Sequence, residues 1–200
     1  MLKKPLQERA VKTRNLFLDT AGQLLAEVGF DKLTTNLICE RAGLTPPALY
    51  HYFSNKYEVV EELGNRLSAE QDVIIYKWMQ TQDAFPFPPV QIAALLNALH
   101  EHSLKQPNAE RIYATLRGMK QTRDNPLFTM QNVSKSCAEW LSKILPEIDP
   151  ELIIIRVRIV IQAMFGVHTM LLENPEMDAE KTNEETAEML GAFIGNLTNK

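Results

Sequence analysis

Hydrophobic side chains recur at the spacing of an α-helix near the start of the chain. Counted from Leu16, they stand one, five, eight, nine and twelve residues further on, up to Val28, with Thr20 at the fourth residue. This spacing places them on one face of a helix with 3.6 residues per turn. Gly29 follows directly, in the position where a left-handed residue often ends a helix. The pattern predicts a first helix from about Leu6 to Val28.

Two short helices are predicted next. One spans Thr34 to Ala42, with Thr34 or Thr35 as its N-terminal cap and Gly43 as its stop. The other follows Thr45 and carries two prolines in its first turn, where backbone N–H groups lack helical partners in any case. Together they have the spacing of a helix-turn-helix motif.

The rest of the chain is divided by prolines and glycines into longer helical patterns. A helix is expected from Ser54-Asn55 to about Gln82, followed by a proline-rich loop at 85–89. Further helices are expected near 89–105, 108–120, 127–145 and 151–173. The last is expected over 183–198, because Thr182 and Glu185 have capping-box spacing.

The segment from Ile153 to Ile161 is ambiguous, because its β-branched residues alternate as they would in a strand. A helix is favoured, since the apolar pattern continues to Leu172 and the sequence offers no partner strand. We therefore predict an all-α protein of about nine helices. It would consist of an N-terminal three-helix helix-turn-helix domain (1–56) and a larger helical ligand-binding and dimerisation domain (57–200).

The helix-turn-helix has the residues needed to hold its second helix away from the body. Apolar side chains on both short helices can lock them at a steep angle, and a glycine at the corner gives the backbone its freedom: Ile38, Ala42, Gly43, Leu49 and Phe53. Hydroxyl, imidazole and ammonium groups at its far end are suitable donors to phosphate oxygens: Tyr50, His51, Tyr52 and Lys56.

The distribution of charge agrees with a nucleic-acid contact at the N-terminus. Residues 1–56 contain eight Lys and Arg against five Asp and Glu, a balance of +3, whereas the remaining residues have a balance of −7. A basic segment on an acidic chain would meet a polyanion through that segment alone. Chance surface composition is the alternative explanation.

Composition limits the class of protein further. With 200 residues, 45% of them hydrophobic, the chain can form a packed core. Two cysteines, Cys39 and Cys137, offer no disulfide framework and favour a reducing compartment. The first residues lack the apolar core of a signal peptide, and the uncharged run 159–172 is shorter than a bilayer span. We expect a cytoplasmic protein without a membrane segment.

The stretch GFDKLTTNLICERAGLTPPALYHYFSNKYEVVEEL resembles the signature of the tetracycline-repressor (TetR) family. The matching positions are Gly29, Thr34, Ile38, Ala42, Gly43, Leu44, Thr45, Leu49, Tyr50, Tyr52, Phe53 and Lys56. Two positions depart from the usual pattern: Pro47 stands where glycine is common, and Cys39 where alanine is common. The resemblance covers roughly residues 10–60, and beyond them only the length and the helical pattern agree.

The resemblance implies a dimeric DNA-binding regulator, a repressor that leaves its operator when a small, largely apolar effector binds. The second short helix would enter the major groove, where Asn36 and the segment 46–48 often read bases in the family. Because Pro46, Pro47 and Ala48 offer few hydrogen bonds, readout would depend on Thr35, Asn36, His51 and apolar contacts with thymine. The candidate DNA-binding residues are Thr34, Thr35, Asn36, Thr45, Pro46, Pro47, Ala48, Tyr50, His51, Tyr52 and Lys56.

The resemblance also implies a homodimer through the two C-terminal helices and an apolar effector cavity in the larger domain. Aromatic and methionine residues suit such a cavity, although each of them could equally belong to an ordinary core. The candidate ligand-binding residues are Trp78, Tyr113, Met119, Phe128, Trp140, Met164, Phe165 and His168.

Enzymatic chemistry has little support in the sequence. It contains no HExxH, CxxC or Gly-rich phosphate motif, and His100 and His102 are two residues apart, so they cannot face one metal ion from a helix. Arg156 and Arg158 could meet a ligand carboxylate or, preferably, an acid across a dimer. No cofactor or metal is expected. The alternative is a helical protein-interaction or enzyme module with a vestigial DNA-binding domain.

Overall fold

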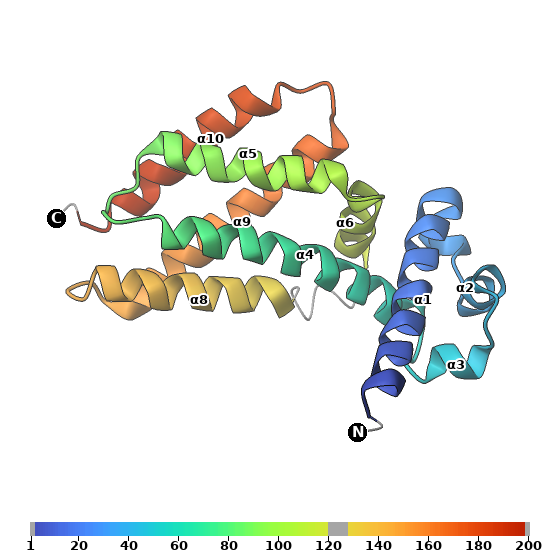
Figure 1. The fold of residues 1–200 in the computed structure, drawn as a ribbon. Helices are drawn as coiled ribbons and strands as arrows, with labels where there is room; N and C mark the ends of the chain where they lie inside the picture. Colours follow the sequence, from blue (N-terminus) through green and yellow to red (C-terminus); the bar gives the residue numbers. More distant parts are fainter. Residues whose placement is uncertain (1–2, 120–127, 199–200) are drawn as a thin grey trace. The chain divides into compact units, whose positions relative to one another are not determined.

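The computed structural model describes residues 3–119 and 128–198, with side chains described for 8–119 and 131–198. Over these residues the chain forms nine helices and no strand, as predicted (Figure 1). They belong to two compact units. Unit 1 contains residues 3–66 and 107–119, and unit 2 contains residues 67–106 and 128–198.

Unit 1 is built on a long first helix. It contains α1 (Lys3–Lys32), α2 (Thr35–Ala42), α3 (Pro46–Tyr50), the first turns of α4 (Lys56–Gln80) and α6 (Ala109–Gly118). Both α2 and α6 pack against α1, and the Asn108 side chain donates a 3.1 Å hydrogen bond to the carbonyl oxygen of Gly22. The buried face of α1 predicted from the apolar spacing includes Phe17, Ala21 and Leu24, each fully buried.

Gly29 interrupts α1 rather than ending it. Its φ of 75° is left-handed, as predicted for a helix-ending glycine, but helical structure resumes over the next three residues. The Leu33 N–H closes that extra turn by donating to the carbonyl oxygens of Gly29 and Phe30, both at 3.2 Å. The predicted end at Val28 is therefore a break within a longer helix.

The caps of the two short helices are close to those predicted. The Thr34 hydroxyl accepts a 3.1 Å hydrogen bond from the Leu37 N–H at the start of α2, and Gly43 ends that helix with a left-handed φ of 66°. Thr45 precedes α3 without a side-chain capping bond, and prolines occupy the first turn. Asn55 then starts α4, because its side chain accepts from the N–H groups of Tyr57 and Glu58.

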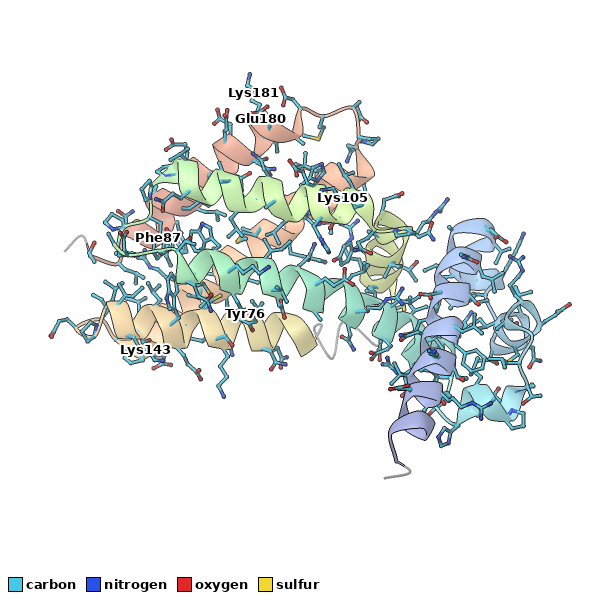
Figure 2. All side chains as sticks on the ribbon, in the orientation of Figure 1. Tyr76, Phe87, Lys105, Lys143, Glu180 and Lys181 are labelled. Atoms are coloured by element: carbon cyan, nitrogen blue, oxygen red, sulfur yellow. The ribbon has the colours of Figure 1, made fainter. Side chains whose placement is uncertain are left out.

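Unit 2 consists of the remainder of α4 with α5 (Pro89–Lys105), α8 (Phe128–Ile144), α9 (Pro150–Glu173) and α10 (Ala179–Gly195). Helix α5 packs against α10, and α8 packs against α9. Charged side chains such as Lys143, Glu180 and Lys181 are exposed on the outside (Figure 2). The ambiguous segment 153–161 lies within α9 and is helical, as favoured by its continuous apolar pattern.

The start of the last helix was predicted wrongly. Helix α10 begins after Asp178, whose carboxylate accepts a 3.0 Å hydrogen bond from the Lys181 N–H. Thr182 lies inside the helix, where its carbonyl oxygen accepts from the Thr186 hydroxyl. Both Asp178 and Thr182 suit an N-terminal cap, and the earlier one adds a further turn of helix.

Helix α9 has an unusual combination of length and hydropathy. Among the described residues it is the one helix long and apolar enough to cross a membrane. Its most apolar 18-residue segment has a mean hydropathy of 1.6, yet only 22% of that segment is buried. A core helix of a soluble protein meets the same criteria of length and composition.

The functional boundary between domains that was expected after Lys56 stays a prediction. The two compact units divide within α4, after Arg66.

Candidate functional site

Helices α2 and α3 form a helix-turn-helix with a common buried seam. Ile38 from α2 and Leu49 from α3 are fully buried, and Phe53, just beyond α3, is 2% exposed. Ala42 is only half-buried. The apolar residues expected to lock the two helices are therefore placed to do so, and α2 packs directly on α3.

The outer surface of this motif presents polar and small side chains. Thr34, Asn36, Thr45, Pro46, Pro47 and His51 are exposed, while Thr35 and Ala48 are half-buried. The hydroxyl oxygens of Thr35 and Tyr50 lie 3.1 Å apart, so the beginning of α2 is linked to the end of α3. Tyr50 is 53% exposed and can reach a partner outside the protein.

Two further predicted DNA-binding residues, Tyr52 and Lys56, also make contacts within unit 1. Tyr52 is half-buried, with its ring 6.3 Å from that of Phe17 and 5.0 Å from that of His51. The Lys56 ammonium donates a 2.9 Å hydrogen bond to the Phe30 carbonyl oxygen and lies 4.3 Å from the Phe30 ring centroid. Both therefore have a structural role, whatever they contribute to binding.

Ion pairs that sequence spacing did not indicate brace the same unit. Arg41 forms a two-pronged pair with Glu27, with both N–O distances at 3.0 Å, and its guanidinium lowers the pKa of the Glu27 carboxyl. Arg14 pairs with Glu62, and Arg66 pairs with Asp19 at 2.7 Å. Among the described side chains of the basic N-terminal segment, Arg9, Lys12 and Lys32 stay exposed.

The sequence of this motif matches a family model. Residues 17–63 match the model described as "Bacterial regulatory proteins, tetR family". The chain carries the N-terminal domain of the TetR family. The match includes α2, α3 and the start of α4, the same segment that forms the helix-turn-helix.

Curated relatives agree with this assignment. The chain is 43% identical over 56 residues to the class A tetracycline repressor of transposon 1721 from Escherichia coli. That alignment covers 28% of this chain and 26% of the repressor, so the chain matches about a quarter of that relative's length. The chain is also 22% identical over 96 residues to the HTH-type transcriptional regulator UidR from Escherichia coli, covering 48% of this chain and 47% of that relative.

Solved structures extend the likeness to the fold of nearly the whole chain. A putative transcriptional regulator from Pseudomonas aeruginosa superposes with a TM-score of 0.70 at 16% identity, covering 93% of this chain and 92% of that chain. The complex of SmeT, a repressor from Stenotrophomonas maltophilia, with triclosan superposes with a TM-score of 0.62 at 20% identity over 90% of each chain. At these identities the TetR fold is what is shared.

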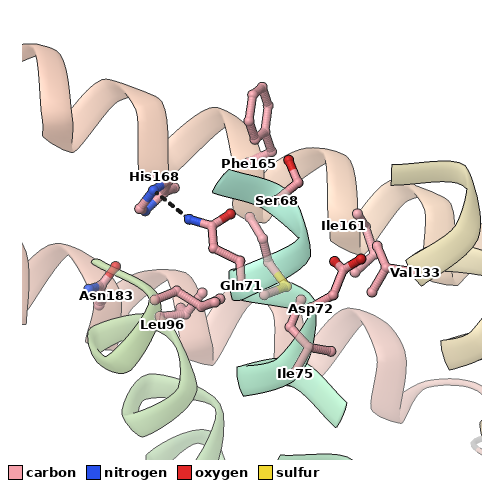
Figure 3. Close-up of a pocket in the computed structure, with 12 residues that line it drawn as sticks. Ser68, Gln71, Asp72, Ile75, Leu96, Val133, Ile161, Phe165, His168 and Asn183 are labelled. Atoms are coloured by element: carbon pink, nitrogen blue, oxygen red, sulfur yellow. Dashed lines mark hydrogen bonds between the residues drawn. The ribbon is translucent and has the colours of Figure 1, made fainter. Parts of the chain in front are cut away.

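Unit 2 of this TetR-fold chain contains two adjacent cavities. The first, of about 60 Å³, is lined by residues of α4, α5, α8, α9 and α10 (Figure 3). The second, of about 80 Å³, is lined mainly by apolar residues, among them Trp78, Phe87 and Trp140. Ile75, Ile161 and Met164 line both cavities and form the wall between them.

One end of the first cavity is polar. The Gln71 amide nitrogen lies 3.2 Å from His168 Nε2, and the Ser103 hydroxyl lies 3.0 Å from the same nitrogen. Burial, with smaller contributions from His100 and His102, lowers the pKa of His168 to about 4. The imidazole is therefore neutral at pH 7 and can accept a hydrogen bond from its neighbours.

The second cavity has an aromatic wall. The rings of Phe87 and Trp140 are stacked with centroids 5.4 Å apart, and Trp78 meets Phe87 edge-on at 5.3 Å. Trp78 Nε1 donates to the Gln91 carbonyl oxygen at 3.0 Å. Cys137 also lines this cavity, and burial raises the pKa of its thiol to about 12. The thiol is thus protonated and unsuited to nucleophilic chemistry.

The structure brings five of the eight candidate ligand residues to these cavities: Trp78, Trp140, Met164, Phe165 and His168. It does not bring Tyr113 and Met119 there. Tyr113 lies on α6 and Met119 directly follows it, both buried in unit 1. The eighth, Phe128, has a side chain outside the described residues.

Several cavity residues were missed because a single sequence does not show which helical faces meet. Asp72 and Gln71 lie on α4 among many polar residues of that helix, and Phe87 lies in the predicted loop. For Gln71 and Asp72, the sequence offered one indication: they are two adjacent polar residues within one turn of apolar positions on a long predicted helix. Arg156, expected at an interface or a ligand, packs on Phe193 of α10 within the chain, with its guanidinium 4.9 Å from that ring; its expected role stays a prediction.

The histidines are not grouped as metal ligands. His102 Nε2 lies 3.1 Å from a Glu70 carboxylate oxygen, whereas the His100 ring lies 6.0 Å from that of His168. Within residues 3–119 and 128–198, no group of three or more His, Cys, Asp or Glu side chains could hold a metal ion.

Proposed function

We propose that this chain is a dimeric transcriptional regulator of the TetR kind, a repressor that binds operator DNA and is released by a small, mainly apolar effector. The observation that carries the proposal is the family-matching helix-turn-helix. Its apolar seam is fully buried, while Asn36, Pro47 and His51 remain exposed. A helix held in this way is narrow enough for the major groove.

The side chains on that surface suit two kinds of contact with DNA, to phosphates and to bases. Tyr50 and the exposed Arg9 and Lys12 suit phosphate contacts, which set the register of a protein on DNA. Asn36 and His51 can hydrogen-bond base edges, and Pro46 and Ala48 can contact thymine methyl groups. The operator sequence would then be read by few hydrogen bonds and by apolar contact.

Dimerisation through α9 and α10 is supported by the apolar surface of these helices. Ile155 and Ile159 lie four residues apart on α9 and are 48% and 49% exposed, while Met189 on α10 is 53% exposed. Apolar side chains at helical spacing that stay exposed in one chain are typical of an interface. A second copy of the chain would cover them and bring two DNA-binding domains to one operator.

The size of the cavities sets a condition on effector binding. At about 60 and 80 Å³, each is smaller than the roughly 150 Å³ cavity that admits benzene. An effector would therefore have to displace the shared wall, including the unbranched and adaptable Met164. SmeT, a protein of the same fold, has been solved in complex with triclosan.

Helix α4 offers a route from cavity to DNA. Ser68, Asp72 and Ile75 line the first cavity, and the helix is continuous back to Lys56, next to the helix-turn-helix. We infer that effector binding shifts the population toward a state in which the two recognition helices no longer match major grooves roughly 34–36 Å apart. A cytoplasmic location, where the DNA is, stays a prediction.

The test is a fluorescence-anisotropy titration of a labelled duplex from the intergenic DNA upstream of the chain's own gene. The account predicts tighter binding to this duplex than to a shuffled duplex of equal length at the same salt concentration. The apparent affinity should fall steeply as salt rises. Equal affinity for both duplexes at every salt concentration would contradict an operator-binding function.

A further inference from the structure

The charge balance of the cavities is uneven. Among the described residues that line the two cavities, Asp72 is the one acid, and no lysine or arginine lies among them. His168 is held neutral by burial. The described lining therefore offers a ligand one formal charge, and it is negative.

The Asp72 carboxylate has no counter-ion among the side chains that the structure describes. Within the described part of the chain it forms no ion pair or side-chain hydrogen bond, unlike the acids Asp19, Glu27, Glu62 and Glu70. Figure 3 shows it directed toward Val133 and Ile161, apolar residues of the same cavity. Burial raises the pKa of Asp72 to about 6, and its charge in turn helps to raise the pKa of Cys137 in the second cavity. The carboxylate thus lies near the boundary between the two spaces.

Two further acceptors accompany it on the same face of α4. Ser68 and Gln71 lie four and one residues before Asp72, and all three line the cavity. The Gln71 amide nitrogen is directed to His168 and Ser103, so its carbonyl oxygen faces the opposite way, as Figure 3 shows. Ser68 is 8% exposed, and its hydroxyl can accept as well as donate.

These three groups match the chemistry of an ammonium group. A protonated primary amine has three N–H donors and no acceptor. A hydroxyl, an amide oxygen and a carboxylate that line one cavity can each accept one of them. The Phe165 ring lines the same cavity and offers a further favourable surface for a cation. A carboxylate or phosphate ligand would be repelled, and a purely apolar one would leave Asp72 unpaired at a cost.

We propose that the effector is a hydrophobic organic cation: its amine pairs with Asp72, Gln71 and Ser68, and its apolar body crosses the Ile75, Ile161 and Met164 wall to the aromatic cavity of Trp78 and Trp140. This inference rests on the proposed effector role of the cavities and specifies the ligand class. The two cavities share a wall, so one elongated molecule can occupy both.

The test compares three probes of the same length that differ in charge: 4-phenylbutylamine, 4-phenylbutan-1-ol and 4-phenylbutanoate, each titrated at pH 7.5. The two tryptophans of the chain are Trp78 and Trp140, and both line the aromatic cavity, so intrinsic fluorescence reports occupancy. We expect the amine to bind at least ten-fold more tightly than the alcohol and the carboxylate to bind most weakly.

Asp72→Asn supplies the second comparison. It should weaken amine binding to within about three-fold of alcohol binding and leave the affinity for the alcohol unchanged, because one charge is removed at nearly constant volume. Asp83→Asn, which removes an exposed acid just after α4, is the matched control and should leave all three affinities unchanged. The ranking of probes on the wild-type chain stands on its own if the Asp72 variant fails to fold.

The outcomes separate the two proposals. Equal affinity of amine and alcohol for the wild-type chain, or amine binding unaffected by Asp72→Asn, would overturn the cation inference and leave an effector cavity intact. Absence of any saturable fluorescence change with all three probes would count against the effector role itself, and the inference would fall with it.

Discussion

The Lys56 ammonium joins the start of α4 to the end of α1 by donating a 2.9 Å hydrogen bond to the Phe30 carbonyl oxygen. The same group lies 4.3 Å from the Phe30 ring centroid and 5.9 Å from that of Tyr57. Lys56, which the family resemblance predicts to contact DNA, therefore also helps to hold the helix-turn-helix in place.

Lys56→Ala should therefore destabilise the protein as well as weaken DNA binding. Loss of a charge-assisted hydrogen bond and a cation–π contact at a half-buried site predicts a decrease of about 1–2 kcal/mol in the free energy of unfolding. Urea unfolding followed by circular dichroism measures it. Lys32→Ala, at an exposed lysine in the last turn of α1, is the control and should change stability little. Equal stability of both variants would contradict the scaffold role.

Gly43 should tolerate alanine poorly. Its φ of 66° is a left-handed conformation in which a side chain is strained, although a Cβ would meet nothing within 4 Å. We expect Gly43→Ala to lower the free energy of unfolding by about 1 kcal/mol. Gly22→Ala is the comparison, because a Cβ there would meet a Leu63 methyl at an ordinary 3.7 Å inside α1, and alanine favours a helix. If the two substitutions have effects of the same sign, the corner does not need glycine.

The hydroxyl of Tyr50 and the imidazole of His51 should have different roles on DNA. Tyr50→Phe removes one donor suited to phosphate, and should weaken binding to operator and shuffled duplexes alike, by about two- to ten-fold. His51→Ala should instead change the preference among operator variants. Anisotropy titrations against a panel of single-base-pair variants measure both. A Tyr50→Phe effect confined to one base pair, or a uniform His51→Ala effect, would reverse the assignment.

Asp72 and His168 should oppose each other in the pH dependence of stability. Folding raises the pKa of Asp72 from 3.8 to about 6, so its ionisation costs stability as pH rises through that range. Folding lowers the pKa of His168 from 6.5 to about 4, so its protonation costs stability as pH falls through that range. The lowered pKa of His100 adds to the second effect. In the wild-type chain, these opposite effects of pH on the free energy of unfolding largely cancel.

Asp72→Asn should reveal the pH dependence of stability that the histidines cause. The variant should become more stable with rising pH between about 4 and 6.5, more steeply than the wild type. At pH 7.5 it should exceed the wild type by about 1 kcal/mol, a figure reduced from the full shift because the carboxyl is half-exposed. Chemical unfolding at a series of pH values gives this result directly. Parallel curves for the two proteins would show that Asp72 is solvated in the fold.

Local rules predicted the helices well because helix ends are set by neighbouring residues. Thr34 and Gly43 bound α2, and the prolines at 46–47 and 89 mark the starts of α3 and α5. The same rules failed at α10, where two residues could cap the helix and Asp178 rather than Thr182 does so. The predicted end of the first helix at Gly29 was wrong for a similar reason, because a left-handed residue can interrupt a helix as well as end it.

The cavity residues depend on contacts between distant helices, which local pattern does not encode. Periodicity indicates that Tyr113 faces a core, but not that this core belongs to unit 1. The pairing of Gln71 with Ser103 and His168 joins residues up to 97 positions apart. The ion pairs of Arg14 and Arg66 likewise link α1 with α4 across more than 45 residues.

The most direct test of the central claim is a hydroxyl-radical footprint of the upstream duplex with the full chain. The account predicts two protected patches of backbone, about one helical turn apart, facing the same side of the duplex. Both should disappear together in a variant with Asn36→Ala and His51→Ala. A uniform cleavage pattern at protein concentrations that saturate the anisotropy signal would contradict a sequence-specific dimer on DNA.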